Sequence, residues 1–317
     1  MTIGDGFDRI LIVDWSAANM ASPRRPSKDA IWVAEAGAGA AAHWYLRTRS
    51  LAMELVAARI ERALARGERV LCGFDFPFGY PAGFAQVVAG EAGALAVWRW
   101  LAGAVCDADD NRSNRFQVAA TANAMFPGIG PFWGCPASVS LPGLPAKGRA
   151  RYGHGMRERR AVEDAVRRAQ PCWKLFTTGS VGSQALLGLA RLQGLRRRFA
   201  GQVAVWPFER LDMPVVLAEI YPSLLDGLVK RAVASAPGVI PDAVQVRLLA
   251  ATLAEMQDRG QLAAALDAAR GEDLAEESWI LGVGAETDLG AAAMAVFDGI
   301  AFALPPQDHP WSGVLSM

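Results

Sequence analysis

Residues 71–81, LCGFDFPFGYP, decide the fold, because an apolar run enters Asp75 and then breaks at two prolines. Residues 9–19, RILIVDWSAAN, repeat the pattern, with four apolar residues leading to Asp14 and a small polar turn. A buried carboxylate is costly unless it is paired, hydrogen-bonded or bound to a metal. Two carboxylates at matching strand ends therefore predict one shared site that holds a cation or a substrate.

The composition is typical of a folded protein without a membrane span. The chain has 317 residues, of which 52% are hydrophobic, enough for a sizeable core. The N-terminus lacks a signal-peptide pattern, and the longest apolar stretch, 289–304, is short for a span and contains Asp298. Four scattered cysteines and three histidines favour reduced thiols and argue against a zinc site. We therefore expect a cytoplasmic protein with no membrane partner.

The charge is balanced overall but uneven along the chain. The formal net charge is zero, yet residues 147–200 carry 13 Lys and Arg against 3 Asp and Glu, a net of +10. Two interpretations stay open. The segment is either a solvated, arginine-rich pair of helices or a face that attracts phosphates.

Apolar runs and turn signals predict the order of the elements. Strands are expected at 9–14, 30–37, 41–48 and 70–75, with a helix between the last two that begins after Ser50 as its N-cap and closes at Gly67. Further segments follow: helices in 84–106 and 156–170, a Gly/Pro-rich loop between them, a helix after 179–184, strands in 202–208 and 215–225, and helices at 242–257 and 288–304.

This order is typical of an RNase H-like α/β fold. We expect a mixed five-stranded sheet in the order 3-2-1-4-5, with flanking helices. The whole chain, 1–317, would form one domain with a helical and loop insertion at about 82–213 and an extra C-terminal helix at about 288–304. Adjacent strands lie about 4.8 Å apart, so Asp14 and Asp75 would sit side by side where ligands bind in open α/β sheets.

Two further carboxylates can complete the predicted acidic cluster. Glu219 ends the strand in 215–225, and Asp242 opens a helix. We predict that Asp14, Asp75, Glu219 and Asp242 are the catalytic and metal-binding residues, with Mg²⁺ or Mn²⁺ as the cofactor because such ions prefer oxygen ligands. Structural alternatives stay open: an Asx-turn at Asp14, an arginine partner for Glu219 and helix capping by Asp242.

Four stretches resemble a known family: VDWSAAN, GFDFPFGYP, AEIYPS and EESWILGV. They resemble an uncharacterised bacterial domain-of-unknown-function family with an RNase H-like fold, some of whose relatives are labelled molybdopterin-guanine-dinucleotide or cobalamin biosynthesis proteins. The resemblance implies that the four carboxylates form the acidic set of that fold, and it supplies no substrate. The chain has Ser278 where the family signature has glycine, and Asp298 competes with Asp242 for the helix-borne carboxylate.

A glycine-rich turn at 179–184 precedes a helix and is a candidate anion site, because helix starts expose N–H groups. It matches neither the P-loop nor the nucleophile-elbow pattern, and a plain helix N-cap is the alternative. Together with the turn after Asp14 and the polar loop 107–123, it provides the predicted phosphate contacts, which are Ser16, Arg115, Lys174, Thr178, Ser180, Ser183 and Gln184.

These features predict a nuclease-like hydrolase, a metal-dependent phosphoryl-transfer enzyme that hydrolyses a phosphodiester or a nucleotide. Its partner would be a phosphate-bearing small molecule or a nucleic acid. One alternative is an actin- or sugar-kinase-like phosphotransferase that uses ATP. Another is a binding module that kept the fold and lost catalysis. The sequence leaves the substrate, the metal and the oligomeric state open.

Overall fold

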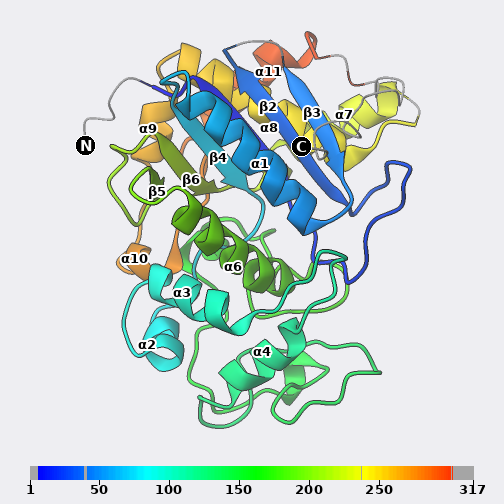
Figure 1. Cartoon of the computed structure of the whole chain (residues 1–317), viewed down its shortest axis with the longest axis vertical. Coiled ribbons are helices and arrows are strands. Elements are labelled where there is room, and N and C mark those ends of the chain that lie inside the picture. Colours follow the sequence, from blue (N-terminus) through cyan, green and yellow to red (C-terminus); the bar gives the residue numbers. More distant parts are fainter. Residues whose placement is uncertain (1–5, 39–40, 237, 301, 303–317) are drawn as a thin grey trace.

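A single mixed β-sheet forms the centre of the molecule (Figure 1). The computed structural model describes residues 6–38, 41–236, 238–300 and 302. Within them the sheet has six strands in the order β3-β2-β1-β4-β6-β5. The strands are β1 (Arg9–Asp14), β2 (Ile31–Gly37), β3 (Ala42–Leu46), β4 (Val70–Phe74), β5 (Val203–Val205) and β6 (Val215–Glu219).

The predicted arrangement of the first four strands is confirmed. β1, β2 and β3 pair antiparallel, and β4 lies parallel to β1 on its other side. The five-stranded order is not confirmed, because the sheet has six strands and β6, not β5, lies beside β4. The three-residue β5 pairs only with β6 and forms the edge of the sheet. The next strand beside the two aspartates is therefore the one that ends in Glu219.

Helices cover both faces of the sheet (Figure 1). One apolar cluster contains α1 and α6 on one face and continues into α2, α3 and α4, which lie below α6 in Figure 1. A second cluster contains α8 on the other face, together with α7, α9 and α11. The first group comprises α1 (Arg49–Leu64), α2 (Phe84–Ala89), α3 (Ala94–Ala104), α4 (Arg115–Asn123) and α6 (Gly182–Arg198). The second comprises α7 (Asp226–Ser235), α8 (Pro241–Asp258), α9 (Leu262–Leu266) and α11 (Glu286–Phe297).

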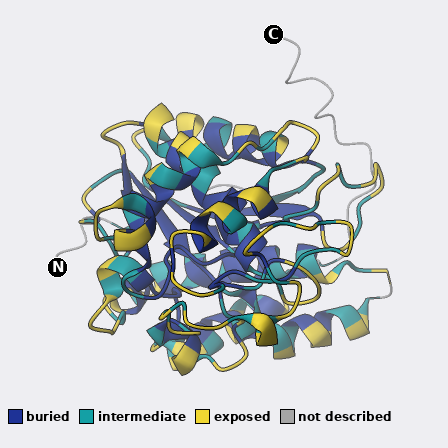
Figure 2. Ribbon diagram, turned by 90° about the horizontal axis from the view of Figure 1, so that it is seen from below, coloured by how far each residue is buried: buried dark blue, intermediate teal, exposed yellow. Residues whose placement is uncertain are grey.

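Short elements complete the fold: α5 (Ala161–Ala165), α10 (Leu274–Glu277) and the 3₁₀ turns η1 (Gly148–Ala150) and η2 (Pro222–Leu225). Figure 2 shows the buried residues gathered in the strands and on the inner faces of the helices. Apolar side chains alternate between the two clusters along β1, with Leu11 and Val13 in one and Ile10 and Ile12 in the other. A strand buried on both faces explains its uninterrupted apolar sequence.

Several predicted helix boundaries need correction. The N-cap of α1 is Thr48, not Ser50, because the Thr48 hydroxyl accepts the N–H of Leu51. The predicted helix in 84–106 is two helices, since the segment 90–93 contains two glycines with positive φ. The predicted helix at 156–170 is reduced to α5, and the closing helix ends at Phe297, before the undescribed residues 301 and 303–317.

The loop after β4 is fixed by close packing on both sides. A Cβ on Gly188 of α6 would lie 2.3 Å from the Phe76 ring, and one on Gly79 would lie 2.1 Å from the carbonyl oxygen of Glu276. Phe76 also packs against Trp15, with ring centroids 5.7 Å apart. The two turns that follow Asp14 and Asp75 are therefore held against each other by aromatic contact.

Ser278 has a backbone conformation that favours glycine. Its φ is +68° and its ψ is −176°, and the residue is buried. That region of backbone space is occupied almost only by glycine and costs about 1–3 kcal/mol for other residues. A glycine at this position, as in the family signature that EESWILGV resembles, would adopt this backbone conformation without strain.

None of the helices in residues 6–38, 41–236 and 238–300 combines the length and the apolar character that crossing a bilayer requires.

Candidate functional site

Asp14 and Asp75 lie side by side at the ends of two parallel strands. Val13 of β1 is in register with Phe74 of β4, and the backbone N–H of Asp75 donates to the carbonyl of Val13 at 3.0 Å. In the described part of the chain, neither side-chain carboxylate accepts a hydrogen bond. The described residues therefore show no Asx-turn at Asp14, because no backbone N–H donates to its side chain. In the same segment, the N–H of Ala18 donates to the Ser16 hydroxyl.

Burial and neighbouring negative charges raise the pKa values of both aspartates. Burial, followed by the charge of Asp75, raises the pKa of Asp14 well above its usual range. Burial, followed by the charges of Glu219 and Asp242, raises the pKa of Asp75 to about 7. Two adjacent carboxylates resist double ionisation unless a cation neutralises them. At neutral pH the pair is therefore suited to holding a proton or a cation.

Glu219 has a cationic partner. Its Oε1 accepts from Arg160 Nη2 at 2.7 Å, and its Oε2 accepts from Arg160 Nη1 and from the Phe78 N–H, both at 2.8 Å. Glu219 and Arg160 are both buried. The structure thus shows the arginine partner from the basic segment, and the role of Glu219 as a metal ligand stays a prediction. In the structure, Glu219 fixes the loop after Asp75 by accepting the Phe78 N–H.

Asp242 faces the site from the first turn of α8. Its Oδ2 accepts the N–H of Asp29 at 2.6 Å, and its side chain does not cap the helix. Burial is the main cause of its raised pKa, and its charge in turn raises the pKa values of Asp14 and Asp75. Asp298 is exposed at the end of α11 and lies 3.4 Å from Arg231. Asp242 is therefore the helix-borne carboxylate that acts electrostatically on the pair.

The donor set limits which metal could bind. No group of three or more His, Cys, Asp or Glu side chains in the described ranges has an arrangement that could hold a metal ion. Two carboxylates still fit Mg²⁺, which usually keeps several waters and binds through one or two carboxylates together with substrate phosphates. Asp14 and Asp75 meet that requirement, because their oxygens are not committed to hydrogen bonds within the described chain.

The turn after Asp14 is held by a buried arginine. Arg49 Nη1 donates to the carbonyls of Ser16 at 3.1 Å and Ala18 at 2.8 Å. The Ser16 hydroxyl donates to the carbonyl of Asp29 at 2.9 Å and accepts the N–H of Ala18. Ser16 is buried, so its predicted phosphate contact has no support in this conformation. These hydrogen bonds hold the turn, which leads to the exposed Asn19.

The glycine-rich turn uses most of its polar groups internally. Lys174 Nζ donates to the carbonyl of Thr178 at 2.6 Å, the buried Ser183 hydroxyl donates to the carbonyl of Leu175, and Gln184 Nε2 donates to the carbonyl of Trp15. α6 begins at Gly182, so the helix after this turn is confirmed. Gln184 connects it to the turn after Asp14. Thr178 is exposed and Ser180 partly buried, and an anion at this turn stays a prediction.

Ion pairs use much of the positive excess of residues 147–200. Seven of the 13 basic side chains pair with carboxylates, many of them outside the segment. The pairs are Arg151–Glu158, Arg157–Asp164, Arg157–Glu277, Arg160–Glu163, Arg160–Glu219, Arg168–Asp226, Arg191–Asp107, Arg196–Glu209, Arg198–Glu54 and Arg198–Glu61. Much of this charge therefore binds the insertion to the rest of the protein.

Sequence reasoning missed three side chains that shape the site. Arg160 holds Glu219, Arg49 holds the turn after β1, and Glu277 accepts the N–H groups of Ala82 and Ala161 at 3.1 and 2.6 Å. Each partner is distant in sequence, so no local pattern marks these residues. The motif EESWILGV contains Glu277 and offered the only signal.

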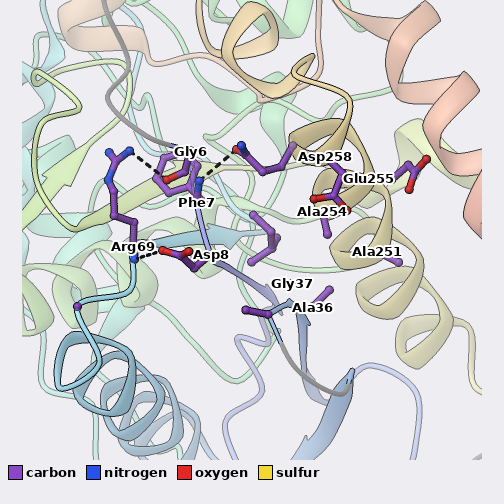
Figure 3. Close-up of a pocket in the computed structure, with 14 residues that line it drawn as sticks. Gly6, Phe7, Asp8, Ala36, Gly37, Arg69, Ala251, Ala254, Glu255 and Asp258 are labelled. Atoms are coloured by element: carbon purple, nitrogen blue, oxygen red, sulfur yellow. Dashed lines mark hydrogen bonds between the residues drawn. The ribbon is translucent and has the colours of Figure 1, made fainter.

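A cavity of about 890 Å³ lies at the other end of the strands (Figure 3). Its wall includes Phe7 and Asp8 before β1, Gly37 at the end of β2, and Arg69 before β4. Asp8 accepts the backbone N–H of Arg69 at 2.7 Å. Since β1 runs from this end to Asp14, the cavity is separate from the carboxylate pair and contains none of the predicted site residues.

Comparisons of the chain with protein-family models, with curated proteins and with solved structures find no significant match. The family resemblance of the four stretches therefore stays a prediction, and the functional argument rests on the geometry of the site.

Proposed function

We propose that this protein is a metal-dependent phosphoryl-transfer enzyme of RNase H-like fold that hydrolyses a phosphate ester, either a phosphodiester or a nucleotide. One observation carries the proposal: Asp14 and Asp75 lie at the ends of adjacent parallel strands, and no residue in the described part of the chain donates a hydrogen bond to either side chain. Side chains with strongly perturbed pKa values are enriched at functional sites. A pair kept without a partner supports a cation-binding role better than a structural one.

The protein's own residues would divide the work. Asp14 and Asp75 would hold Mg²⁺ or Mn²⁺, and Asp242 would add negative charge from α8. Such an ion neutralises charge on a phosphate and lowers the pKa of a bound water. Arg160 and Glu219 fix the loop that carries Asp75, while Arg49 fixes the turn that follows Asp14. These contacts keep the pair in place before a substrate arrives.

Hydrolysis assays with matched variants test this function. With Mg²⁺ or Mn²⁺ supplied, the wild type should release phosphate or cleave a diester from a panel of nucleotides and oligonucleotides. Asp14→Asn and Asp75→Asn should reduce the rate by about 10²-fold or more. Asp109→Asn, an exposed aspartate in the loop before α4, should keep the wild-type rate.

Two outcomes would reject the proposal. If ATP is consumed only when a small-molecule acceptor is present, the phosphotransferase alternative replaces hydrolysis. If no substrate turns over and Mn²⁺ fails to stabilise the wild type, the site is neither catalytic nor metal-binding.

A further inference from the structure

Three arginine side chains approach one buried aspartate beside the turn that follows β1. Arg49 Nε donates to Asp107 Oδ2 at 3.0 Å, and Arg191 Nε donates to the same oxygen at 2.8 Å. The side chain of Asp107 is 4% exposed, and that of Arg49 is fully buried. Two guanidinium groups therefore already share this single carboxylate. Arg115 is the third arginine, and the charges of both Arg49 and Asp107 act on it.

Arg115 is buried without a carboxylate of its own. Only 7% of the residue is exposed, and no Asp or Glu in the described ranges lies within ion-pair distance of it. Its Nη1 donates to Asn19 Oδ1 at 3.0 Å and to the Ser113 hydroxyl at 3.1 Å, while its Nε has no acceptor. A buried donor left unsatisfied is costly, so the missing partner needs an explanation.

Arg115 is also the first residue of α4, whose N-terminus has no side-chain cap. The side chain of Asn114, at the N-cap position, is used elsewhere. It accepts the N–H of Cys106 at 2.8 Å and donates to the carbonyl of Ala104 at 2.9 Å. Uncapped N–H groups and the helix dipole favour a negative charge at such an end. An anion would therefore interact favourably with both the N-terminus of α4 and the Arg115 guanidinium.

The charges in the cluster indicate which anion fits. Three guanidinium groups against the one carboxylate of Asp107 leave two positive charges uncompensated. Of the acidic residues in the same loop, Asp110 is exposed and binds Arg112 instead. A phosphate monoester carries nearly two negative charges at neutral pH, whereas a diester carries one. Arginine is the side chain best shaped to bind a phosphate through two donors.

We propose that Arg115, the N-terminus of α4 and Asn19 bind the dianionic phosphate of a small phosphate monoester, such as a terminal nucleotide phosphate. Asn19 belongs to the segment that follows Asp14, so one short stretch of chain connects the phosphate site to the carboxylate pair. The role of this phosphate as part of the substrate rests on the proposed function. Its binding does not, because no carboxylate of the pair takes part.

Binding is measured with inorganic phosphate, methyl phosphate and dimethyl phosphate, by calorimetry and by the shift in melting temperature. The wild type should bind the first two and not dimethyl phosphate. Arg115→Gln should bind about 10- to 100-fold more weakly. Its matched control, Arg112→Gln, removes an exposed arginine three residues away and should bind as the wild type does.

Stability in phosphate-free buffer provides the folding control. Arg115→Gln removes a buried charge that has no carboxylate within ion-pair distance, but it also weakens the contacts with Asn19, Ser113 and the Phe116 ring. Its melting temperature should therefore stay close to that of the wild type. Should that variant fold poorly, Arg115→Lys keeps the charge, loses the planar fork and should still weaken binding by about tenfold. Equal binding by wild type and Arg115→Lys would overturn the proposal. Equal phosphate affinities of Arg115→Gln and Arg112→Gln would also overturn it, because they would indicate adventitious binding only. The same holds if the wild type does not bind phosphate or binds dimethyl phosphate more tightly than methyl phosphate.

Asp75→Asn separates this inference from the proposed function. That variant should lose hydrolysis and keep phosphate binding, because Asp75 does not contact the cluster. Failure of hydrolysis in every variant would leave the anion site standing. Loss of phosphate binding in Asp75→Asn would show that the anion sits at the carboxylate pair and not at Arg115.

Discussion

Arg160 and Glu219 form a buried pair with two hydrogen bonds, at 2.7 and 2.8 Å between the guanidinium nitrogens and the carboxylate oxygens. Arg160 comes from the insertion and Glu219 from the end of β6, so the pair attaches the insertion to the sheet beside the site. Glu163 also accepts from Arg160, at 2.8 Å. Because Arg160 is a buried cation, its charge has to be compensated by the carboxylates of Glu163 and Glu219.

Glu219→Gln should therefore destabilise the protein. Removing one partner of a buried ion pair costs about 3–5 kcal/mol, because the other charge is left without compensation. Urea unfolding measures the loss. The control is Glu91→Gln, which breaks an exposed pair with Arg99 and should cost less than about 1 kcal/mol. An equally small loss in Glu219→Gln would show that Arg160 does not depend on this carboxylate.

The parts of the fold that depend on a local sequence pattern could be predicted. The apolar runs of β1 and β4 predicted two parallel strands that place Asp14 beside Asp75, and the structure has them. The place of β5 could not be predicted, because three residues carry no register information and β6 has the longer apolar run. An arginine partner for Glu219 was one of the alternatives, but the sequence did not identify Arg160, and it gave no sign of the contact between Arg49 and the turn at Ser16. Arg160 and Arg49 lie 59 and 33 residues away from Glu219 and Ser16, and only the folded chain brings them together.

Ser278→Gly should stabilise the protein by about 1 kcal/mol. The substitution relieves a φ of +68° at a buried position, and part of the gain is offset by the greater freedom of glycine in the unfolded chain. Urea unfolding of both proteins measures the difference. Ser278→Ala is the control, since it keeps the Cβ and should give no gain. If alanine stabilises as much as glycine, backbone strain is not the cause.

The carboxylate pair predicts how stability changes with pH in metal-free protein. The pKa of Asp75 is about 7 in the folded state, and that of an unfolded aspartate is about 3.9. Between these values the folded state keeps a proton that the unfolded state releases. The free energy of unfolding should therefore fall as the pH rises from about 4 to 7, by an amount on the order of 3 kcal/mol. Because Asp14 interacts with Asp75, the fall belongs to the pair.

Asp75→Asn should reduce this fall, because asparagine cannot ionise, while Asp14, whose pKa burial also raises, still can. The variant should match or exceed the wild type near pH 4 and gain on it steadily up to pH 7, while Asp109→Asn should follow the wild-type curve. Saturating Mn²⁺ should restore wild-type stability at pH 7 and leave Asp75→Asn unchanged, since an ion that binds only the folded state at 100 times its Kd adds about 2.7 kcal/mol. A wild-type curve that stays flat from pH 4 to 7, with Asp75→Asn less stable throughout, would mean that Asp75 is an ionised structural residue. The shared-cation site would then be wrong.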